Sequence, residues 1–289
     1  MTHLVGSRSS VEFGPGLPVL LINDQIRVYD QTPQVLAELA AGRCDILAQL
    51  ACEGAAAGCR AVDILIDHPA LVEADVLPRV VQAVDAAVGC PISLDSRNPL
   101  AIERALDGYT GKALLNSISG ERALLDALLP LVAKHRLAVV ALLVDDMQVP
   151  QTWQERLAVA RAILARADDA GIPREDIAFD AVCMAASTLP GSLQVTLDTL
   201  AAIHGELGMS TILGIGNAGI GMPDQTRIDL AYLIAAVPWG LDAALVDYHT
   251  ENLLVASRAI DFLSGRDPVG ANYIGLYRAS RPRRRNAAE

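Results

Sequence analysis

The sequence predicts a single α/β domain, a (β/α)8 TIM barrel, and two observations carry that prediction. Short apolar runs alternate eight times with segments whose apolar residues recur at helical spacing, which requires a parallel sheet with right-handed crossovers. The chain has 289 residues, of which 52% are hydrophobic and only 4% aromatic. This length suits a barrel of about 250 residues, and aliphatic residues suit a parallel sheet that is buried on both faces.

The predicted elements follow one another without a break from Pro18 onward. The expected strands are the apolar runs at 18–23, 61–66, 92–94, 112–115, 138–144, 176–179, 210–213 and 243–246. The expected helices are the periodic segments at 33–58, 72–87, 99–106, 121–135, 152–170, 191–205, 224–236 and 251–264. Gly58 and Cys59 mark the end of the first helical segment. Eight such units close a barrel, whereas six would leave an open sheet.

Three segments are expected along the chain. Residues 1–17 are polar, contain Gly and Pro and show no period, so they are expected to lead into the barrel domain at 18–266. Residues 267–289 form a C-terminal extension that ends in Arg281-Pro282-Arg283-Arg284-Arg285, where proline and like charges favour a disordered tail. No Gly- or Ser-rich spacer divides the chain, so a second domain is not expected.

Composition bounds the partners and the compartment. The net charge is −11 and no basic stripe runs along an expected element, which argues against nucleic acid and membrane surfaces as partners. The cysteines lack the spacing of a zinc site or a disulfide framework and are expected to be free thiols; they are Cys44, Cys52, Cys59, Cys90 and Cys183. No signal-peptide pattern and no bilayer-length apolar stretch is present, so a cytoplasmic protein is expected.

Polar residues stand where the expected strands end, which is where the active sites of such barrels lie. They are Asp24, Asp67, Asp95, Asn116, Asp145, Asp146, Asp180, Asn217 and Asp247. Any one of them could instead cap the helix that follows, because Asp and Asn are favoured there. Asp95 and Asn116 directly continue apolar strands, however, and Ser96, Ser117 or Ser119 could do the capping.

Two other types of site compete with this interpretation. Carboxylates could bind a divalent cation through oxygen, but the five histidines form no cluster with them, and no metal is expected. The run Gly214-Ile215-Gly216-Asn217-Ala218-Gly219 fits the dinucleotide fingerprint, yet it falls at the seventh strand. We expect these glycines to let the backbone turn sharply around Asn217 and come close to a ligand.

Two acids and two amides at one barrel mouth suit a flat heterocycle. A carboxylate accepts two N–H bonds at once, and an amide donates to a carbonyl while accepting from another N–H. A 2-amino-4-oxo pyrimidine presents these groups. We therefore expect Asp95, Asn116, Asp180 and Asn217 to hold one such ring.

The motifs Pro91 to Ser96, Lys112 to Glu121, Phe179-Asp180 and Gly214 to Asn217 carry a family resemblance. They resemble the pterin-binding TIM barrels of methyltetrahydrofolate:corrinoid methyltransferases and of the folate domain of cobalamin-dependent methionine synthase, within the dihydropteroate synthase-like superfamily. The similarity runs from about Val19 to Phe262, which is nearly the whole barrel.

The resemblance implies a methyltransferase that moves a methyl group between N5 of tetrahydrofolate, the substrate, and the cobalt of a corrinoid (cobalamin) on a partner protein. By the same resemblance, Asp95, Asn116 and Asp180 hold the pterin, and Asn217 lies near N5 as the catalytic residue. Asp24 keeps an acid that the family has after strand one. A homodimer without a metal in this chain is also implied.

The chain departs from the family pattern at three places. Arg27 stands where the family has an asparagine after strand one, and Leu65 replaces the polar residue of an Asp-x-Asn motif on strand two. Ala218-Gly219 replaces the usual Val-Ser after Asn217. The pterin-holding residues survive these changes better than the methyl-transfer pocket does.

Two alternative functions remain at this stage. A dihydropteroate synthase shares the barrel and the pterin-holding residues, but that family has a Lys after strand seven, and residues 214–222 contain none. A non-catalytic pterin-binding barrel is favoured by the loss of the polar group at Leu65. Methyl-transfer assays in both directions separate these alternatives from the methyltransferase.

Overall fold

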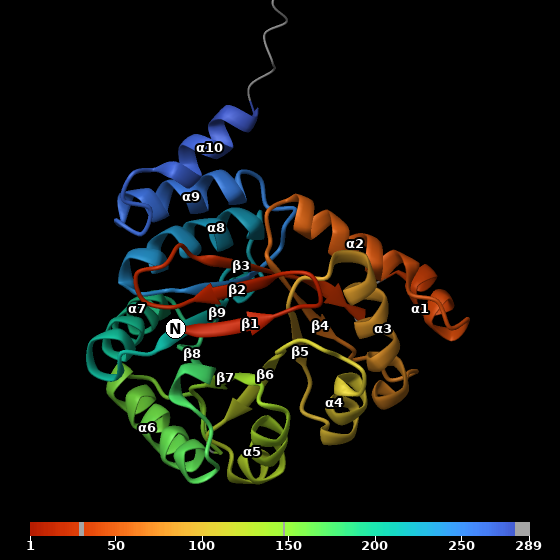
Figure 1. Ribbon diagram of the computed structural model, residues 1–289. Helices are drawn as coiled ribbons and strands as arrows, with labels where there is room; N and C mark the ends of the chain where they lie inside the picture. The colour runs from red at the N-terminus through yellow and green to blue at the C-terminus, as the bar shows by residue number, and fades with distance from the viewer. Residues whose placement is uncertain (29–31, 147, 281–289) are drawn as a thin grey trace, which may run out of the picture.

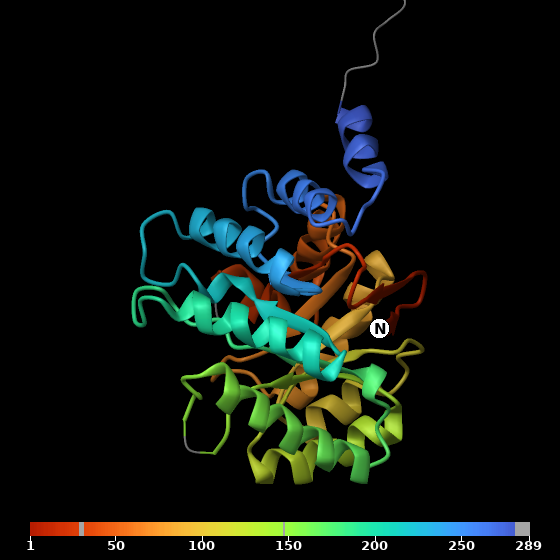
Figure 2. The ribbon, with the colours of Figure 1, turned by 90° about the vertical axis from the view of Figure 1, so that its left-hand side faces the viewer.

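The computed structural model describes residues 1–28, 32–146 and 148–280, and its centre is a closed barrel of eight parallel strands (Figures 1 and 2). The strands are β3 Leu20–Arg27, β4 Ala61–Leu65, β5 Ile92–Asp95, β6 Leu114–Ser119, β7 Ala138–Leu142, β8 Ile177–Asp180, β9 Ser210–Gly214 and β10 Ala243–Val246. They pair in chain order, and β10 returns to pair with β3. The predicted TIM barrel is therefore confirmed.

Helices surround the barrel (Figure 1). They are α1 Pro33–Ala40, α2 Asp45–Ala56, α3 Glu73–Val88, α4 Pro99–Leu106, α5 Arg122–His135, α6 Trp153–Asp169, α7 Ser192–Ala202, α8 Gln225–Ala236, α9 Leu253–Leu263 and α10 Ala271–Ser280. Short helical turns lie between some of the elements: η2 Arg174–Asp176, η3 Ile203–Leu207, η4 Ile215–Asn217 and η5 Val237–Trp239. The single helix expected at 33–58 is divided in two, because Gly42 adopts a left-handed conformation (φ 79°) between α1 and α2.

The first 17 residues, expected only to lead into the barrel, form a hairpin of β1 Thr2–Val5 and β2 Ser10–Phe13. Leu4, Val11 and Phe13 are buried, and they form one apolar cluster with barrel residues such as Leu114 and Ala178. The hairpin therefore closes the end of the barrel at which the strands begin. The two strands have only four residues each, too few for a clear alternation in the sequence.

Side chains alternate along each barrel strand between two cores. On β3, Leu20 and Ile22 belong to the inner cluster with the hairpin, whereas Leu21 belongs to the cluster between the barrel and its helices. The inner apolar cluster lies at the end of the barrel where the strands begin, next to the hairpin. The opposite end, where the strands end, is the mouth of the barrel, and polar side chains lie there.

The C-terminal extension contains α10, which contacts α9 and projects away from the barrel in both views (Figures 1 and 2). The expected disorder of Arg281 to Arg285 concerns residues outside the described ranges. Within the described ranges, no helix is long and apolar enough to cross a membrane. All five cysteines are free thiols.

The hairpin makes a testable contribution to stability. We expect Phe13→Ala to lower the free energy of unfolding by about 3–5 kcal/mol, because it empties a fully buried position at the base of the barrel. Urea unfolding followed by circular dichroism measures this change. Glu12→Ala on the same hairpin is the control, because Glu12 is exposed. Equal effects of the two substitutions would show that the hairpin does not belong to the core.

Candidate functional site

The mouth of the barrel gathers acidic and amide side chains from neighbouring strands. Asp95 of β5 lies in register with Asn116 of β6 on one side and with Leu65 of β4 on the other. Asp63 points inward one pleat below, and Asp180 ends β8. Parallel pairing thus places Asp95 and Asn116 side by side, as the sequence predicted.

Asp63 fixes the orientation of the Asn116 amide. Asn116 Nδ2 donates a hydrogen bond to Asp63 Oδ1 at 3.2 Å. This bond uses one of the two Nδ2 hydrogens and orients the amide, whose Oδ1 can accept an N–H from a ligand. Asp63 is only 1% exposed, and its Oδ2 has no hydrogen-bond partner among the described residues. A buried carboxylate oxygen without a partner is costly, and it is typical of functional sites.

Burial dominates the electrostatics of these carboxyls. Burial raises the pKa of Asp63, and the neighbouring Asp95 carboxyl raises it further. Burial also raises the pKa of Asp95, while the Arg27 guanidinium opposes that rise. Two carboxyls that share a low-dielectric space resist being ionised together. A ligand that donates N–H groups to them would favour their charged forms.

Asp180 is held by the chain that follows β8. Its Oδ1 accepts a hydrogen bond from the backbone N–H of Val182 at 2.8 Å. Burial raises the pKa of Asp180 to about 6. Arg156, only 1% exposed, braces this segment by donating to the carbonyl oxygens of Pro150 at 3.1 Å and Ala181 at 2.5 Å. The hydrogen bonds of Arg156 therefore hold the backbone next to Asp180 in place.

Asp24 is engaged by its own strand. It is 2% exposed, forms an ion pair with Arg27 at 3.3 Å and accepts a hydrogen bond from Gln25 Nε2 at 2.6 Å. Burial raises the pKa of Asp24, and the Arg27 charge opposes that rise. Asp24 thus lies at the mouth as predicted, but its carboxylate holds Arg27, the residue that departs from the family pattern.

Asn217 lies in the turn η4, directly after β9, and is exposed. A Cβ atom added to Gly214 would lie 3.2 Å from Asn217 Nδ2, and one added to Gly216 would lie 3.8 Å from Asp24 Oδ2. Asn217 and Asp24 therefore border the same rim of the mouth. Gln225 of α8 steadies this turn by donating to the Gly216 carbonyl at 2.7 Å.

The glycines of this turn differ in what the missing side chain allows. Gly214 has φ −78°, and neither Gly214 nor Gly216 is in a left-handed conformation. At Gly219 an added Cβ would come within 2.6 Å of the Gln225 carbonyl oxygen. The last glycine of the run thus permits close packing against α8, and the expected approach of Gly214 and Gly216 to a ligand stays a prediction.

Helix capping does not occupy the predicted ligand-binding residues. The α4 helix is capped by Asn98, whose side chain accepts from the backbone N–H of Leu100 at 3.1 Å. Before α5, Ser119 Oγ accepts from the backbone N–H of Glu121 at 3.3 Å. Asp95 and Asn116 are therefore not N-caps, and both side chains are half-buried at the mouth.

Two residues of the site were noticed in the sequence only through family motifs. Asp63 is the acid of the Asp-x-Asn motif that Leu65 alters, and its position inside the apolar run from Ala61 to Leu65 was a further signal. Arg27 appeared only as a departure from the family motif. Among residues 1–28, 32–146 and 148–280, no group of three or more His, Cys, Asp or Glu side chains is arranged to hold a metal ion.

The fold and the mouth together define a class of protein: a (β/α)8 barrel with carboxylates and an oriented amide at its mouth. The chain belongs to the pterin binding enzyme family, whose model matches residues 45–247. The family resemblance read from the sequence motifs is thereby confirmed.

Two curated relatives share part of their sequence with this chain. Over 229 residues the chain is 24% identical to a methylcorrinoid:tetrahydrofolate methyltransferase of Eubacterium limosum, covering 78% of this chain and 84% of that protein. It is 28% identical over 182 residues to the methionine synthase of Mycobacterium tuberculosis, covering 58% of this chain and 15% of that longer enzyme.

Solved structures with the same fold include two dihydropteroate synthases. One, from Yersinia pestis, was solved with a pterine-sulfa conjugate and superposes with a TM-score of 0.68 at 16% identity, covering 91% of this chain and 98% of that one. The other, from Coxiella burnetii in complex with pteroic acid, gives 0.66 at 17% identity, covering 92% and 99%. At these identities the likeness establishes the shared barrel alone.

Burial of Asp63 has a consequence for stability. A folded-state pKa above the unfolded value of about 3.9 means that stability is greatest below that pH and is lost as pH rises through the folded pKa. We therefore expect Asp63→Asn to stabilise the protein at pH 7 by about 1–3 kcal/mol, with little gain at pH 4. Urea unfolding at both pH values measures the difference.

Asp146→Asn is the control, because it makes the same change at an exposed acid near the mouth. Asp180→Ala would be a poor control, because it removes side-chain volume as well as a carboxyl group. Asn at position 63 can still accept the Asn116 hydrogen bond, so the site geometry should survive. A loss of stability at pH 7, or a gain of the same size at both pH values, would contradict the burial argument.

Proposed function

We propose that the chain is a methyltransferase that moves a methyl group between N5 of tetrahydrofolate and the cobalt of a corrinoid carried by a separate protein. The observation that carries the proposal is the pairing of Asp95 with Asn116 at the mouth, with the amide held by Asp63. The family membership and the Eubacterium limosum relative support the choice of ligand and reaction.

In the proposed complex, Asp95 and Asp180 accept the N–H groups of the 2-amino-4-oxo pyrimidine ring. Asn116 Oδ1 accepts a further ring N–H, because its Nδ2 is engaged by Asp63. These three groups come from different strands, so they fix the ring in position and angle. Asp24 contributes indirectly by holding Arg27 at the rim of the mouth.

Asn217 is the proposed catalytic residue. The N5–methyl bond breaks readily only when N5 gains positive character, and a hydrogen bond to N5 that strengthens as charge develops lowers the barrier. Its position supports this role, because Asn217 lies in an exposed turn directly after β9, next to Gly214. The bound corrinoid supplies the cobalt that exchanges the methyl group.

Methyl transfer is preferred to dihydropteroate synthesis on two grounds. The Eubacterium limosum relative, of which the chain covers 84%, is a methyltransferase. The dihydropteroate synthases, at 16–17% identity, share only the fold. In addition, residues 214–222 contain no lysine, and Val246-Asp247-Tyr248-His249 provides neither Arg nor Lys for a pyrophosphate.

Calorimetric titration with tetrahydrofolate, joined to a methyl-transfer assay, tests the proposal. We expect Asp95→Ala and Asp180→Ala each to weaken binding by about 1–3 kcal/mol, because ring N–H donors lose charged acceptors. Asn217→Ala should leave affinity within a few-fold but lower turnover by about tenfold or more. Asp146→Ala is the matched control, an exposed acid near the mouth.

Unchanged folate affinity in both aspartate variants would overturn the pterin site. Folate binding without methyl transfer in either direction, with free cobalamin and with corrinoid proteins, would instead identify a non-catalytic pterin-binding barrel. Pteroate formation from a pterin pyrophosphate and an aryl amine would favour the synthase.

We also propose a homodimer, formed through an apolar surface on the C-terminal helices. Its residues are Ile234, Trp239, Val255, Phe262, Leu263, Val269, Tyr273, Ile274 and Tyr277, all at least 37% exposed. Leu263 and Val269 reach 76% and 77% exposure. A ten-residue helix such as α10 is marginal in water without packing, and a second copy could cover it.

Sedimentation velocity tests the dimer. The wild-type protein should sediment at twice the chain mass of 30.5 kDa, and Leu263→Glu combined with Ile274→Glu should give the monomer. Val72→Glu is the control, because Val72 is 64% exposed and does not belong to this apolar surface. A wild-type monomer at micromolar concentration would contradict the proposal.

A further inference from the structure

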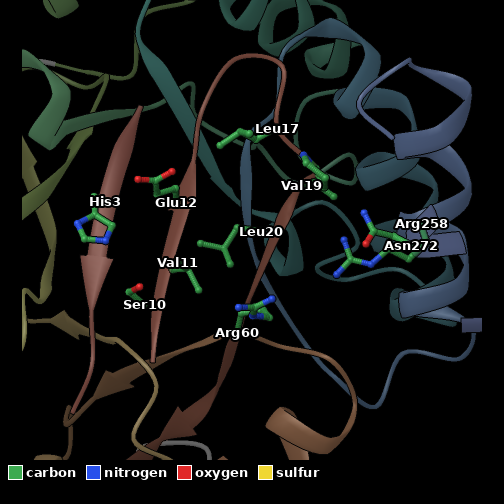
Figure 3. A pocket seen from close by; sticks show the side chains of 11 residues that line it. His3, Ser10, Val11, Glu12, Leu17, Val19, Leu20, Arg60, Arg258 and Asn272 are labelled. Carbon is green, nitrogen blue, oxygen red and sulfur yellow. The ribbon is translucent and has the colours of Figure 1, made fainter. Parts of the chain in front are cut away.

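A second cavity lies at the end of the barrel opposite the mouth. Its volume is about 430 Å³, within the range of small-molecule sites (Figure 3). It runs between the hairpin, the start of β3 and the C-terminal helices, and is lined by residues that include Glu12, Leu20, Arg60, Arg258 and Asn272. None of the residues assigned to the mouth lines it.

Two arginines face this cavity from different elements. Arg60 directly precedes β4 and is exposed, and Arg258 of α9 reaches toward β3 with a side chain that is 18% exposed (Figure 3). Arg258 is oriented by Asp261, whose Oδ2 lies 3.4 Å from its Nη1. Asp261 in turn accepts the backbone N–H of Val19 at 2.9 Å, so this guanidinium is anchored to the barrel.

Several polar side chains line the cavity without a side-chain hydrogen bond or ion pair to another described residue. Within residues 1–28, 32–146 and 148–280, no side-chain hydrogen bond or ion pair is recorded for Arg60, His3 or Asn272. Guanidinium, imidazole and amide groups are all able to donate hydrogen bonds. Leu17, Val19 and Leu20 provide an apolar wall beside them.

We propose that this cavity binds a small molecule bearing a phosphate or carboxylate group, with the oxyanion between Arg60 and Arg258. Arginine suits this role because its planar fork matches both kinds of oxyanion. The protein carries a net charge of −11, so a cavity lined by two arginines and by one acid, Glu12, is a local exception, although Arg258 is also paired with Asp261. Asn272 offers a further donor from α10.

The charges of the cavity also exclude one occupant. The C-terminal tail of the chain contains Arg281, Arg283, Arg284 and Arg285, and these would be repelled by Arg60 and Arg258. A free small anion satisfies the same groups without that repulsion. This inference is independent of the proposed methyl transfer, because the site lies at the other end of β3.

Calorimetric titration of the full chain with inorganic phosphate, pyrophosphate and citrate tests the inference. We expect saturable binding of at least one of them, weakened by about tenfold or more in Arg60→Gln, because one of two guanidinium groups is lost. Arg43→Gln, an exposed arginine remote from the cavity, should leave binding unchanged. Arg258→Lys keeps the positive charge but not the planar fork, so it should weaken binding by itself. The double variant Arg60→Gln with Arg258→Lys should weaken binding more than Arg258→Lys alone.

Thermal melting without ligand shows whether each variant is folded, and Arg60 is the primary site because it has no structural partner to lose. Absence of saturable binding by all three anions would overturn the inference. Equal weakening by Arg43→Gln would also overturn it, because it would indicate non-specific attraction of anions. Loss of binding in Asp180→Ala but not in Arg60→Gln would place the anion at the mouth instead.

Discussion

The hydrogen bond from Asn116 to Asp63 is the contact on which the mouth of this barrel depends. It joins β6 to β4 across β5, the strand on which Asp95 lies in register with Asn116 and Ser93 in register with Asp63. It also settles which end of the amide faces a ligand. Without a buried acceptor at position 63, Asn116 could present either its oxygen or its nitrogen, and the site would lose its selectivity for N–H donors.

This arrangement is costly for folding. Asp24, Asp63, Asp95 and Asp180 are all acids whose pKa is raised by burial, which means that the folded state disfavours their charged forms. A core evolved for stability alone would place apolar side chains there. The acids are more easily understood as a surface prepared for a ligand that supplies the missing hydrogen bonds.

The barrel was predictable from the sequence because its strands are buried on both faces and its helices keep a clear period. The start of α4 and the bounds of β10 were predicted to the residue, and α1 and α2 were merged because the left-handed turn at Gly42 carries little signal. The hairpin was missed since its apolar residues, Leu4, Val11 and Phe13, contact the barrel only through tertiary packing.

The site was predictable to a similar degree. Strand ends and parallel register were enough to bring Asp95 next to Asn116, because neighbouring strands end at the same edge. The role of Asp63 depends on a side-chain contact between strands that are not adjacent, which a linear pattern does not contain. The engagement of Asp24 by Arg27 was likewise visible only as a substitution in a motif.

In the proposed complex, ionised carboxylates at the mouth receive the N–H groups of a pterin. Titration with tetrahydrofolate near pH 6, in buffers of different ionisation enthalpy, measures the protons exchanged on binding. Because the pKa of Asp180 is about 6 in the free protein and should fall on binding, we expect net proton release that declines toward pH 8. Binding with no proton exchange at pH 6, or with net proton uptake, would show that these carboxylates do not receive the ring.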